Sequence, residues 1–161
     1  MCGCPSGDLG TARVLEVITV RIENTVTIER EPEEVWAYLS DLEHIPGWNP
    51  AITATRKVTR GPVGVGTVYE QDRTEPRPGT ESIEVTRFDP ELRLELHGTL
   101  GPFVAELSYG FEDLGGATRL TNVADLEAAG ALKLYQPIAA RRIRAAIAAN
   151  LRQLKGRVES A

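Results

Sequence analysis

The chain has 161 residues, the size of a single domain with a substantial core. Hydrophobic residues make up 42% of it and charged residues 25%, an ordinary composition that excludes a fibrous or wholly disordered protein. No apolar run approaches the roughly 18 residues of a membrane span, and the first residues lack the basic and apolar segments of a secretion signal. We therefore expect a cytoplasmic protein without integral membrane association.

The net charge of −5 is unevenly placed along the chain. From Pro137 onward, six basic residues stand against one acidic residue, so this part carries +5 and residues 1–136 carry −10. A basic helix can indicate a nucleic acid or an acidic lipid as partner. We favour a solvated helix face that complements an acidic sheet, and we expect no nucleic acid partner, because the acidity of the whole chain opposes phosphate binding.

The N-terminal residues are polar and contain Gly and Pro, which predicts a flexible extension over residues 1–16 before one domain over 17–161. The only cysteines, Cys2 and Cys4, lie in this extension. Their C-x-C spacing differs from the C-x-x-C of redox motifs, and no second group of Cys or His completes a zinc site. The sequence therefore predicts no metal and no cofactor.

The first predicted element is a strand within residues 16–30, where apolar and polar residues alternate. One face of this strand carries Ile18, Val20, Ile22, Asn24, Val26 and Ile28.

Two short helices are predicted next. Pro32 lies where a first helical turn begins, and the glutamates that follow it suit the positive end of the helix dipole. The S-x-x-E pattern at residues 40–43 is a capping box, which predicts a second helix that starts at Asp41. Pro46 and Gly47 end it.

Six further strands are separated by short turns with no helix between them, which indicates an antiparallel meander. They are expected within residues 52–60, 67–75, 80–88, 92–98, 103–113 and 118–127. A long amphipathic helix over about residues 130–159 closes the chain, and Pro137 either kinks it or begins its main segment. Its apolar stripe consists of Leu132, Tyr135, Ala139, Ile143, Ala146, Ile147, Leu151, Leu154 and Val158.

These elements predict an α+β fold in which a curved seven-stranded antiparallel sheet wraps around the long C-terminal helix, with two short helices between strands 1 and 2. The long helix is the only element able to cover the apolar face of the sheet. A strongly curved sheet around one helix should leave space between them at one end.

Several motifs carry a resemblance to a known family. They are "TVTIEREPEEVWAYLSDLEHIPGWNP" (25–50), "GVGTVYE" (64–70), "FDPELRLEL" (88–96), "YGFEDLGGATRLT" (109–121) and "ANLRQLKGRVE" (149–159). With the order of elements, they resemble the START-like superfamily, also called the SRPBCC or polyketide cyclase/dehydrase-like family. The resemblance covers residues 17–159 and implies the helix-grip fold, with a cavity between sheet and helix. It implies no single activity, because members include lipid carriers, hormone receptors, aromatic cyclases, hydroxylase substrate domains and chaperone activators.

The cavity implied by the family has its mouth near the loop after the short helices, where Trp48 stands between Pro46 and Pro50. Trp48 either lines this mouth, with its indole nitrogen free to donate a hydrogen bond, or plugs the core.

Strand alternation predicts the other cavity-lining residues. The more apolar faces of the strands carry Tyr69, Gln71, Leu92, Leu94, Leu96, Phe103, Ala105, Leu107, Tyr109, Phe111, Leu120, Asn122, Ala124 and Leu126. The polar members are candidates for orienting a ligand, because burial of a polar group without a partner costs about 1–3 kcal/mol. They could instead bond to one another or to buried water.

From these faces we select as candidate ligand-binding residues Trp48, Tyr69, Gln71, Leu94, Leu107, Tyr109, Asn122 and Tyr135. Tyr135, on the turn before Pro137, would cap the cavity or simply pack against it. The stretch 128–136 contains Gly130 and is a candidate gate.

Catalytic motifs are scarce. His44 and His97 form no metal-binding pattern and are expected to face away from the cavity, and Glu84 should also point outward. No G-x-S-x-G motif is present. With no inward carboxylate or histidine assigned, the catalytic residues remain unknown.

We therefore predict a protein that binds a small hydrophobic or aromatic ligand of lipid, polyketide or isoprenoid type. A cyclase/dehydrase-like enzyme is the first alternative, and a domain that helps another protein is the second. The expected partner is a small apolar ligand, and the chain is expected to be a monomer or a homodimer.

Overall fold

The computed structural model describes residues 18–75, 77–128 and 136–161. Seven strands, two α-helices and one 3₁₀ helix make up this part of the chain. In order they are β1 (Ile18–Ile28), α1 (Pro32–Leu39), η1 (Leu42–Gly47), β2 (Ile52–Lys57), β3 (Val68–Arg73), β4 (Gly79–Asp89), β5 (Arg93–Leu100), β6 (Phe103–Asp113), β7 (Thr118–Ala128) and α2 (Gln136–Glu159). The predicted α+β fold is confirmed.

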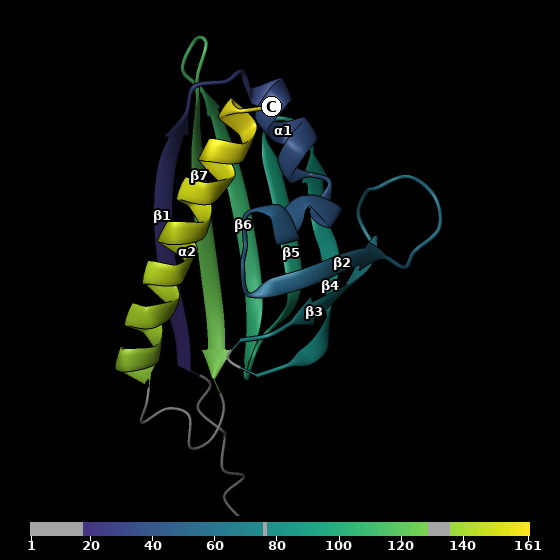
Figure 1. Cartoon of the computed structure of the whole chain (residues 1–161), viewed down its shortest axis with the longest axis vertical. Helices are drawn as coiled ribbons and strands as arrows, with labels where there is room; N and C mark the ends of the chain where they lie inside the picture. The colour runs from purple at the N-terminus through teal and green to yellow at the C-terminus, as the bar shows by residue number, and fades with distance from the viewer. Residues whose placement is uncertain (1–17, 76, 129–135) are drawn as a thin grey trace, which may run out of the picture.

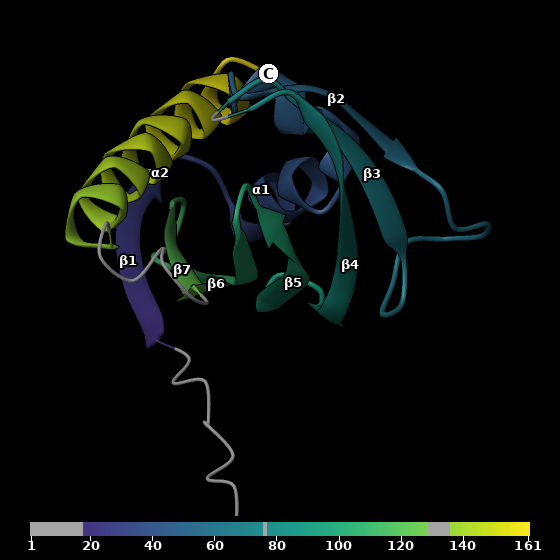
Figure 2. The same ribbon diagram turned by 90° about the horizontal axis from the view of Figure 1, so that it is seen from below.

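All seven strands form one antiparallel sheet in the order β1-β7-β6-β5-β4-β3-β2. The strands from β2 to β7 follow one another as a meander, as predicted, and β1 adds to the far edge by pairing with β7. The sheet curves strongly, and α1, η1 and α2 all lie on its concave side (Figures 1 and 2). None of the helices in the described ranges is long and apolar enough to cross a membrane.

The two short helices begin as the sequence predicts, with one correction. Pro32 occupies the first turn of α1, and the backbone N–H of Glu31 donates to the Glu34 carboxylate at 3.3 Å. The second helix is a 3₁₀ helix whose N-cap is Asp41, and the Asp41 carboxylate accepts from the N–H of Glu43 at 3.1 Å. The predicted cap was Ser40. Asp41 replaces it because the tighter 3₁₀ turn brings a carboxylate within reach of the N–H two residues later.

Helix α2 begins at Gln136, so Pro137 lies in its first turn, where a missing N–H costs nothing. Residues 129–135, which include the start of the predicted helix and most of the candidate gate, lie outside the described residues. The predicted apolar stripe needs one correction, because Ala146 is exposed. Ala146 lies about 100° around the helix from Ile147, at the rim of the stripe rather than at its centre.

The core divides into two clusters along the length of α2. The larger one includes Trp36, Trp48 and the C-terminal half of α2, with Leu151, Leu154 and Val158. The smaller one lies at the other end, under Ile143. Leu107 and Ile147 contact both clusters and join them.

Candidate functional site

A row of polar side chains crosses the concave face of the sheet. Asn24 of β1 lies opposite Asn122 of β7, and Asn122 lies opposite Tyr109 of β6. Residues directly opposite in antiparallel strands have their Cβ atoms about 5 Å apart and on the same face. Asn122 is 1% exposed and Tyr109 is 7% exposed, so alternation placed both correctly on the buried side.

The two asparagines have polar atoms without partners. Among the described residues, Asn24 Nδ2 and Asn122 Oδ1 are buried and make no hydrogen bond. The one bond from the Asn122 side chain is long, 3.4 Å from Nδ2 to the Ser108 carbonyl oxygen. The row therefore presents a buried donor and a buried acceptor that the described residues leave unsatisfied.

A second polar group lies across β2 and β3. Thr55 of β2 lies opposite Gln71 of β3. Tyr69 precedes Gln71 by two residues in β3 and therefore lies on the same face. All three side chains are buried, at 7%, 2% and 1% exposure. The hydroxyl oxygens of Thr55 and Tyr69 are without hydrogen-bond partners among the described residues. Thr55 was not predicted as a site residue. Alternation from the buried Ile52 would place Thr55 outward, and a register shift between Ile52 and Ala54 turns it inward.

Burial changes the acidity of both inward tyrosines. It raises the pKa of Tyr109 to about 12. The pKa of Tyr69 is also raised to about 12, first by burial and then by the nearby negative charges of Asp41 and Glu43. Both phenols therefore stay protonated at neutral pH, and each can donate a hydrogen bond.

Trp48, Leu94 and Leu107 lie in the interior with these polar groups. Trp48 is 5% exposed and belongs to the larger core cluster, which holds it near the C-terminal end of α2. Arg157 of α2 donates from Nε to the carbonyl oxygen of neighbouring Gly47 at 2.9 Å. Leu94 is fully buried, opposite Tyr109. Tyr135 lies outside the described residues.

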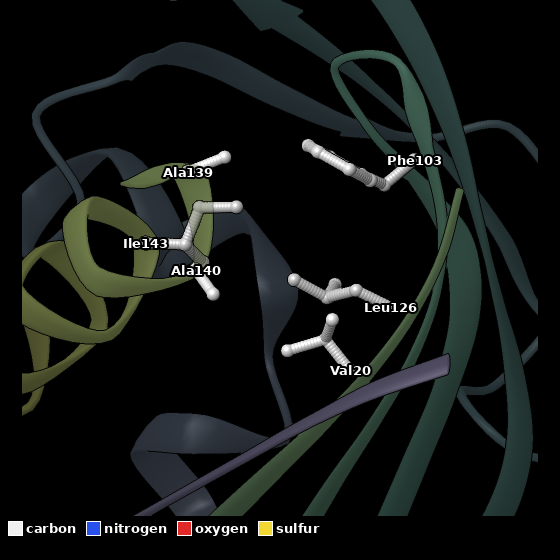
Figure 3. A pocket seen from close by; sticks show the side chains of 6 residues that line it. All are labelled: Val20, Phe103, Leu126, Ala139, Ala140 and Ile143. Carbon is white, nitrogen blue, oxygen red and sulfur yellow. The ribbon is translucent and has the colours of Figure 1, made fainter. Parts of the chain in front are cut away.

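A small apolar cavity lies at the other end of the interior, between α2 and the sheet (Figure 3). Its volume is about 10 Å³, room for one water molecule. The side chains of Ala139, Ala140 and Ile143 from α2 face those of the strands across it, and the strand residues are Val20, Phe103 and Leu126. All six side chains are hydrocarbon, and none was among the selected candidates.

Leu92 corrects the predicted lining, because it is 67% exposed. It lies in the turn before β5, where its N–H donates to the Asp89 carbonyl oxygen at 3.1 Å. Strand alternation does not extend into such a turn.

The concave face also carries a buried ion pair that was not predicted from the sequence. Arg73 Nε of β3 donates to Glu81 Oε2 of β4 at 2.7 Å, and the two side chains are only 7% and 11% exposed. The other Glu81 oxygen accepts from the N–H of Gly101 at 2.9 Å, and Arg73 also donates to the Glu75 carbonyl oxygen at 3.2 Å. Glu81 is thus an inward carboxylate. Its position could have been found, because it shares the parity of Ile83, a buried residue of the same strand.

The remaining titratable candidates lie on the outside, as predicted. Glu84 is exposed. His44 stacks on Tyr38 with ring centroids 4.5 Å apart. His97 lies on the convex face of the sheet, with Nδ1 2.5 Å from Glu106 Oε1. Within the described ranges, no three His, Cys, Asp or Glu side chains gather as a metal site, and Cys2 and Cys4 lie outside those ranges.

The sequence matches one family model over residues 19–159, and that family is described as "Polyketide cyclase / dehydrase and lipid transport". The chain belongs to this family. The match spans every described strand except the first residue of β1, and all of α2. No protein with curated annotation matches the chain in sequence.

Solved structures of this family's fold are similar to the protein. The Zhui aromatase/cyclase from Streptomyces sp. R1128 aligns with a TM-score of 0.75 at 16% identity, over 88% of this chain and 94% of that one. A START superfamily protein from Mycobacterium smegmatis aligns with a TM-score of 0.70 at 20% identity, over 87% of this chain and 97% of that one. The di-domain ARO/CYC StfQ from the steffimycin biosynthetic pathway gives 0.73 at 15% identity, over 88% of this chain and 51% of that one. These likenesses confirm the helix-grip fold.

Proposed function

We propose that this family member binds a small hydrophobic or aromatic molecule, of lipid, polyketide or isoprenoid type, between the concave face of the sheet and α2. The observation that carries the proposal is the set of buried polar atoms without partners on that face, Asn24 Nδ2, Thr55 Oγ1, Tyr69 Oη and Asn122 Oδ1. Each such atom costs about 1–3 kcal/mol when buried unsatisfied. A ligand with carbonyl or hydroxyl groups would recover part of that cost and would be oriented by them.

The apolar part of the binding energy would come from the surroundings of these atoms. Apart from Gln71 and the Arg73–Glu81 pair, their surroundings on the concave face are mostly hydrocarbon, from Leu94 beside Tyr109 to the six residues around the small cavity. Burial of apolar area stabilises a complex by about 25 cal/mol per Å² before the costs of association. The cavity of about 10 Å³ holds no such ligand as it stands, so binding requires the first turns of α2 to move away from the sheet. The two alanines in those turns make few packing contacts with the strands, so the free-energy cost of the movement would be small.

Substitution of Tyr69 by Phe tests the role of the unpartnered polar atoms. Tyr69→Phe removes one hydroxyl group and should weaken binding of an oxygen-bearing aromatic ligand about five- to tenfold, while a pure hydrocarbon probe should bind as before. Tyr38→Phe is the matched control, because the half-buried Tyr38 stacks on the exposed His44 and its hydroxyl is not one of the unpartnered buried atoms. If Tyr69→Phe and the unsubstituted protein bind a series of such ligands with equal affinity, the unpartnered polar atoms of this face do not orient the ligand.

A second candidate function is catalysis of the cyclase/dehydrase type, and the Arg73–Glu81 pair favours it. A carboxylate on the concave face can accept a proton from an acidic C–H group, and a guanidinium beside it can stabilise the enolate oxygen that forms. Glu81→Gln keeps the shape of the side chain and removes its basicity. If the protein is such an enzyme, this change should abolish turnover of a polyketone substrate and leave its affinity nearly unchanged. Turnover at the original rate would exclude Glu81 as the base.

A further inference from the structure

The outer face of the first turns of α2 combines an exposed isoleucine with arginines. Ile138 is 65% exposed, although it is a large apolar residue on a helix that otherwise covers the sheet. At about 100° per residue it lies on the opposite side of α2 from Ile147, which contacts both core clusters. Arg141 and Arg142 lie within about 60° of Ile138 on the same outer side, and both are exposed.

The arginines on this face are available to a partner. None of the ion pairs between described residues involves Arg141 or Arg142. By contrast, Lys155 in the C-terminal half of the same helix pairs with Glu159 at 2.8 Å. Arg141 and Arg142 therefore have no counterion among the described residues.

The same turns form one wall of the apolar cavity. Ala139, Ala140 and Ile143 face Phe103 and Leu126 on the inner side (Figure 3). Along the helix they are interspersed with the exposed residues of the outer side. Any partner that binds the outer face is thus one helix diameter from the cavity, about 10 Å.

We propose that this face, consisting of Ile138, Arg141 and Arg142, docks on an anionic lipid bilayer. A helix with an apolar residue among arginines suits the boundary between headgroups and acyl chains, where each cation near the surface contributes about a fivefold gain in affinity. Nucleic acid fits less well, because it offers the arginines phosphates but offers the exposed Ile138 no hydrocarbon phase comparable to acyl chains. An acidic protein would pair with the arginines but would leave the exposed isoleucine unexplained.

Docking there would place the cavity wall against the bilayer, which holds apolar molecules at high concentration. An apolar ligand could then enter beside α2 without crossing water. This last step rests on the proposed function, whereas the docking itself rests on the exposed face alone.

Flotation with vesicles tests the docking. The full chain is mixed with vesicles of phosphatidylcholine alone or with 30% phosphatidylglycerol, at low and at high salt. We expect binding to the anionic vesicles only, weakened by salt, and reduced at least tenfold in Arg141→Gln/Arg142→Gln and several-fold in Ile138→Asn. These side chains are exposed, so the melting temperature should not change.

Arg60→Gln and Val65→Ser are the matched controls, because both residues are exposed on the loop between β2 and β3, away from α2 (Figure 1). They should bind vesicles as the unsubstituted chain does. The proposal is overturned if anionic vesicles are not bound, if neutral vesicles are bound equally well, or if the controls lose as much binding as the α2 variants. Binding of polyglutamate in place of vesicles would also overturn it and would assign the face to an acidic protein. A fluorescent apolar probe, measured without vesicles, reports the proposed ligand site separately and should be bound equally by all these variants.

Discussion

Thr55 and Thr118 show how two buried threonines in one sheet differ in what their hydroxyl groups contribute. The Thr118 hydroxyl donates to the Arg30 carbonyl oxygen at 2.8 Å, and the side chain is fully buried. The Thr55 hydroxyl has no partner among the described residues. Thr118→Val should therefore cost about 1–3 kcal/mol of unfolding free energy, and Thr55→Val should be neutral or stabilising. Urea unfolding of both variants measures this difference, and equal losses would show that the Thr55 hydroxyl is satisfied in solution.

The raised pKa values of the two inward tyrosines lead us to expect a loss of stability at high pH. The pKa of each is raised to about 12 in the folded protein, against about 10 in an unfolded chain. Between these values the unfolded chain releases protons that the folded protein keeps, so stability is fully present below pH 10 and falls as the pH rises toward 12. The loss should reach up to ~3 kcal/mol for each tyrosine.

Unfolding midpoints at pH 8.5 and pH 11 measure this loss. The double variant Tyr69→Phe/Tyr109→Phe should be less sensitive to pH over this range than the unsubstituted protein, since both phenols are absent. An identical pH dependence in the two proteins would mean that these hydroxyl groups titrate as they do in water.

At the scale of single strands, Gly98 shows a contact that only the structure reveals. A Cβ atom added to Gly98 would lie 2.7 Å from the backbone carbonyl oxygen of Ser82 and 3.1 Å from Ile83 Cγ1. Gly98→Ala should therefore push β5 away from β4 and cost about 1–3 kcal/mol. Gly110 in β6 is the matched control, because a Cβ atom there would meet nothing within 4 Å. Gly110→Ala should be neutral or mildly stabilising. Similar melting temperatures for the two variants would contradict the close approach at Gly98.

The Arg73–Glu81 pair joins β3 and β4, and its removal should affect stability in a non-additive way. Arg73→Met leaves the Glu81 carboxylate buried without its counterion, which should cost about 3–5 kcal/mol. The double variant Arg73→Met/Glu81→Leu removes both charges and should recover most of that loss. A double-mutant cycle by chemical unfolding checks the coupling. Additive losses would indicate that water, rather than each other, solvates the two side chains.

Much of the concave face could be predicted from the sequence because strand alternation has a fixed period of two. Asn122, Tyr109 and Gln71 were placed on the buried face by that rule, and the structure confirms their burial. The rule fails where pairing shifts. A bulge between Val85 and Arg87 lets Phe88 turn inward, where its ring contacts Trp36 at 5.0 Å between centroids. No local pattern marks such a bulge.

The Arg73–Glu81 ion pair and the small cavity were not predicted from the sequence, for different reasons. Glu81 was missed because the polarity of a carboxylate suggested exposure, although its parity placed it inward beside Arg73. The six residues around the cavity are ordinary apolar residues, and space between them depends on how α2 packs on the sheet. Trp48 was predicted either to line the cavity mouth or to plug the core. The structure buries its indole in the core, and a bound ligand would decide whether the indole also lines a binding site.

For the whole molecule, the fold joins a solvated convex surface to a concave face that is apolar but for a few buried polar groups. The similar solved structures share the fold. The central claim is that the concave face and α2 enclose a small apolar ligand that the unpartnered polar groups orient. Cytoplasmic location and a monomeric or homodimeric state remain predictions.

Native mass spectrometry of the purified protein, followed by denaturing extraction and identification of any released molecule, tests this claim most directly. We expect the protein to carry one apolar molecule with at least one carbonyl or hydroxyl group, or to take up such a molecule stoichiometrically when it is offered. A protein that is empty and also refuses a panel of fluorescent apolar probes would contradict the claim, and would favour a domain that acts on another protein.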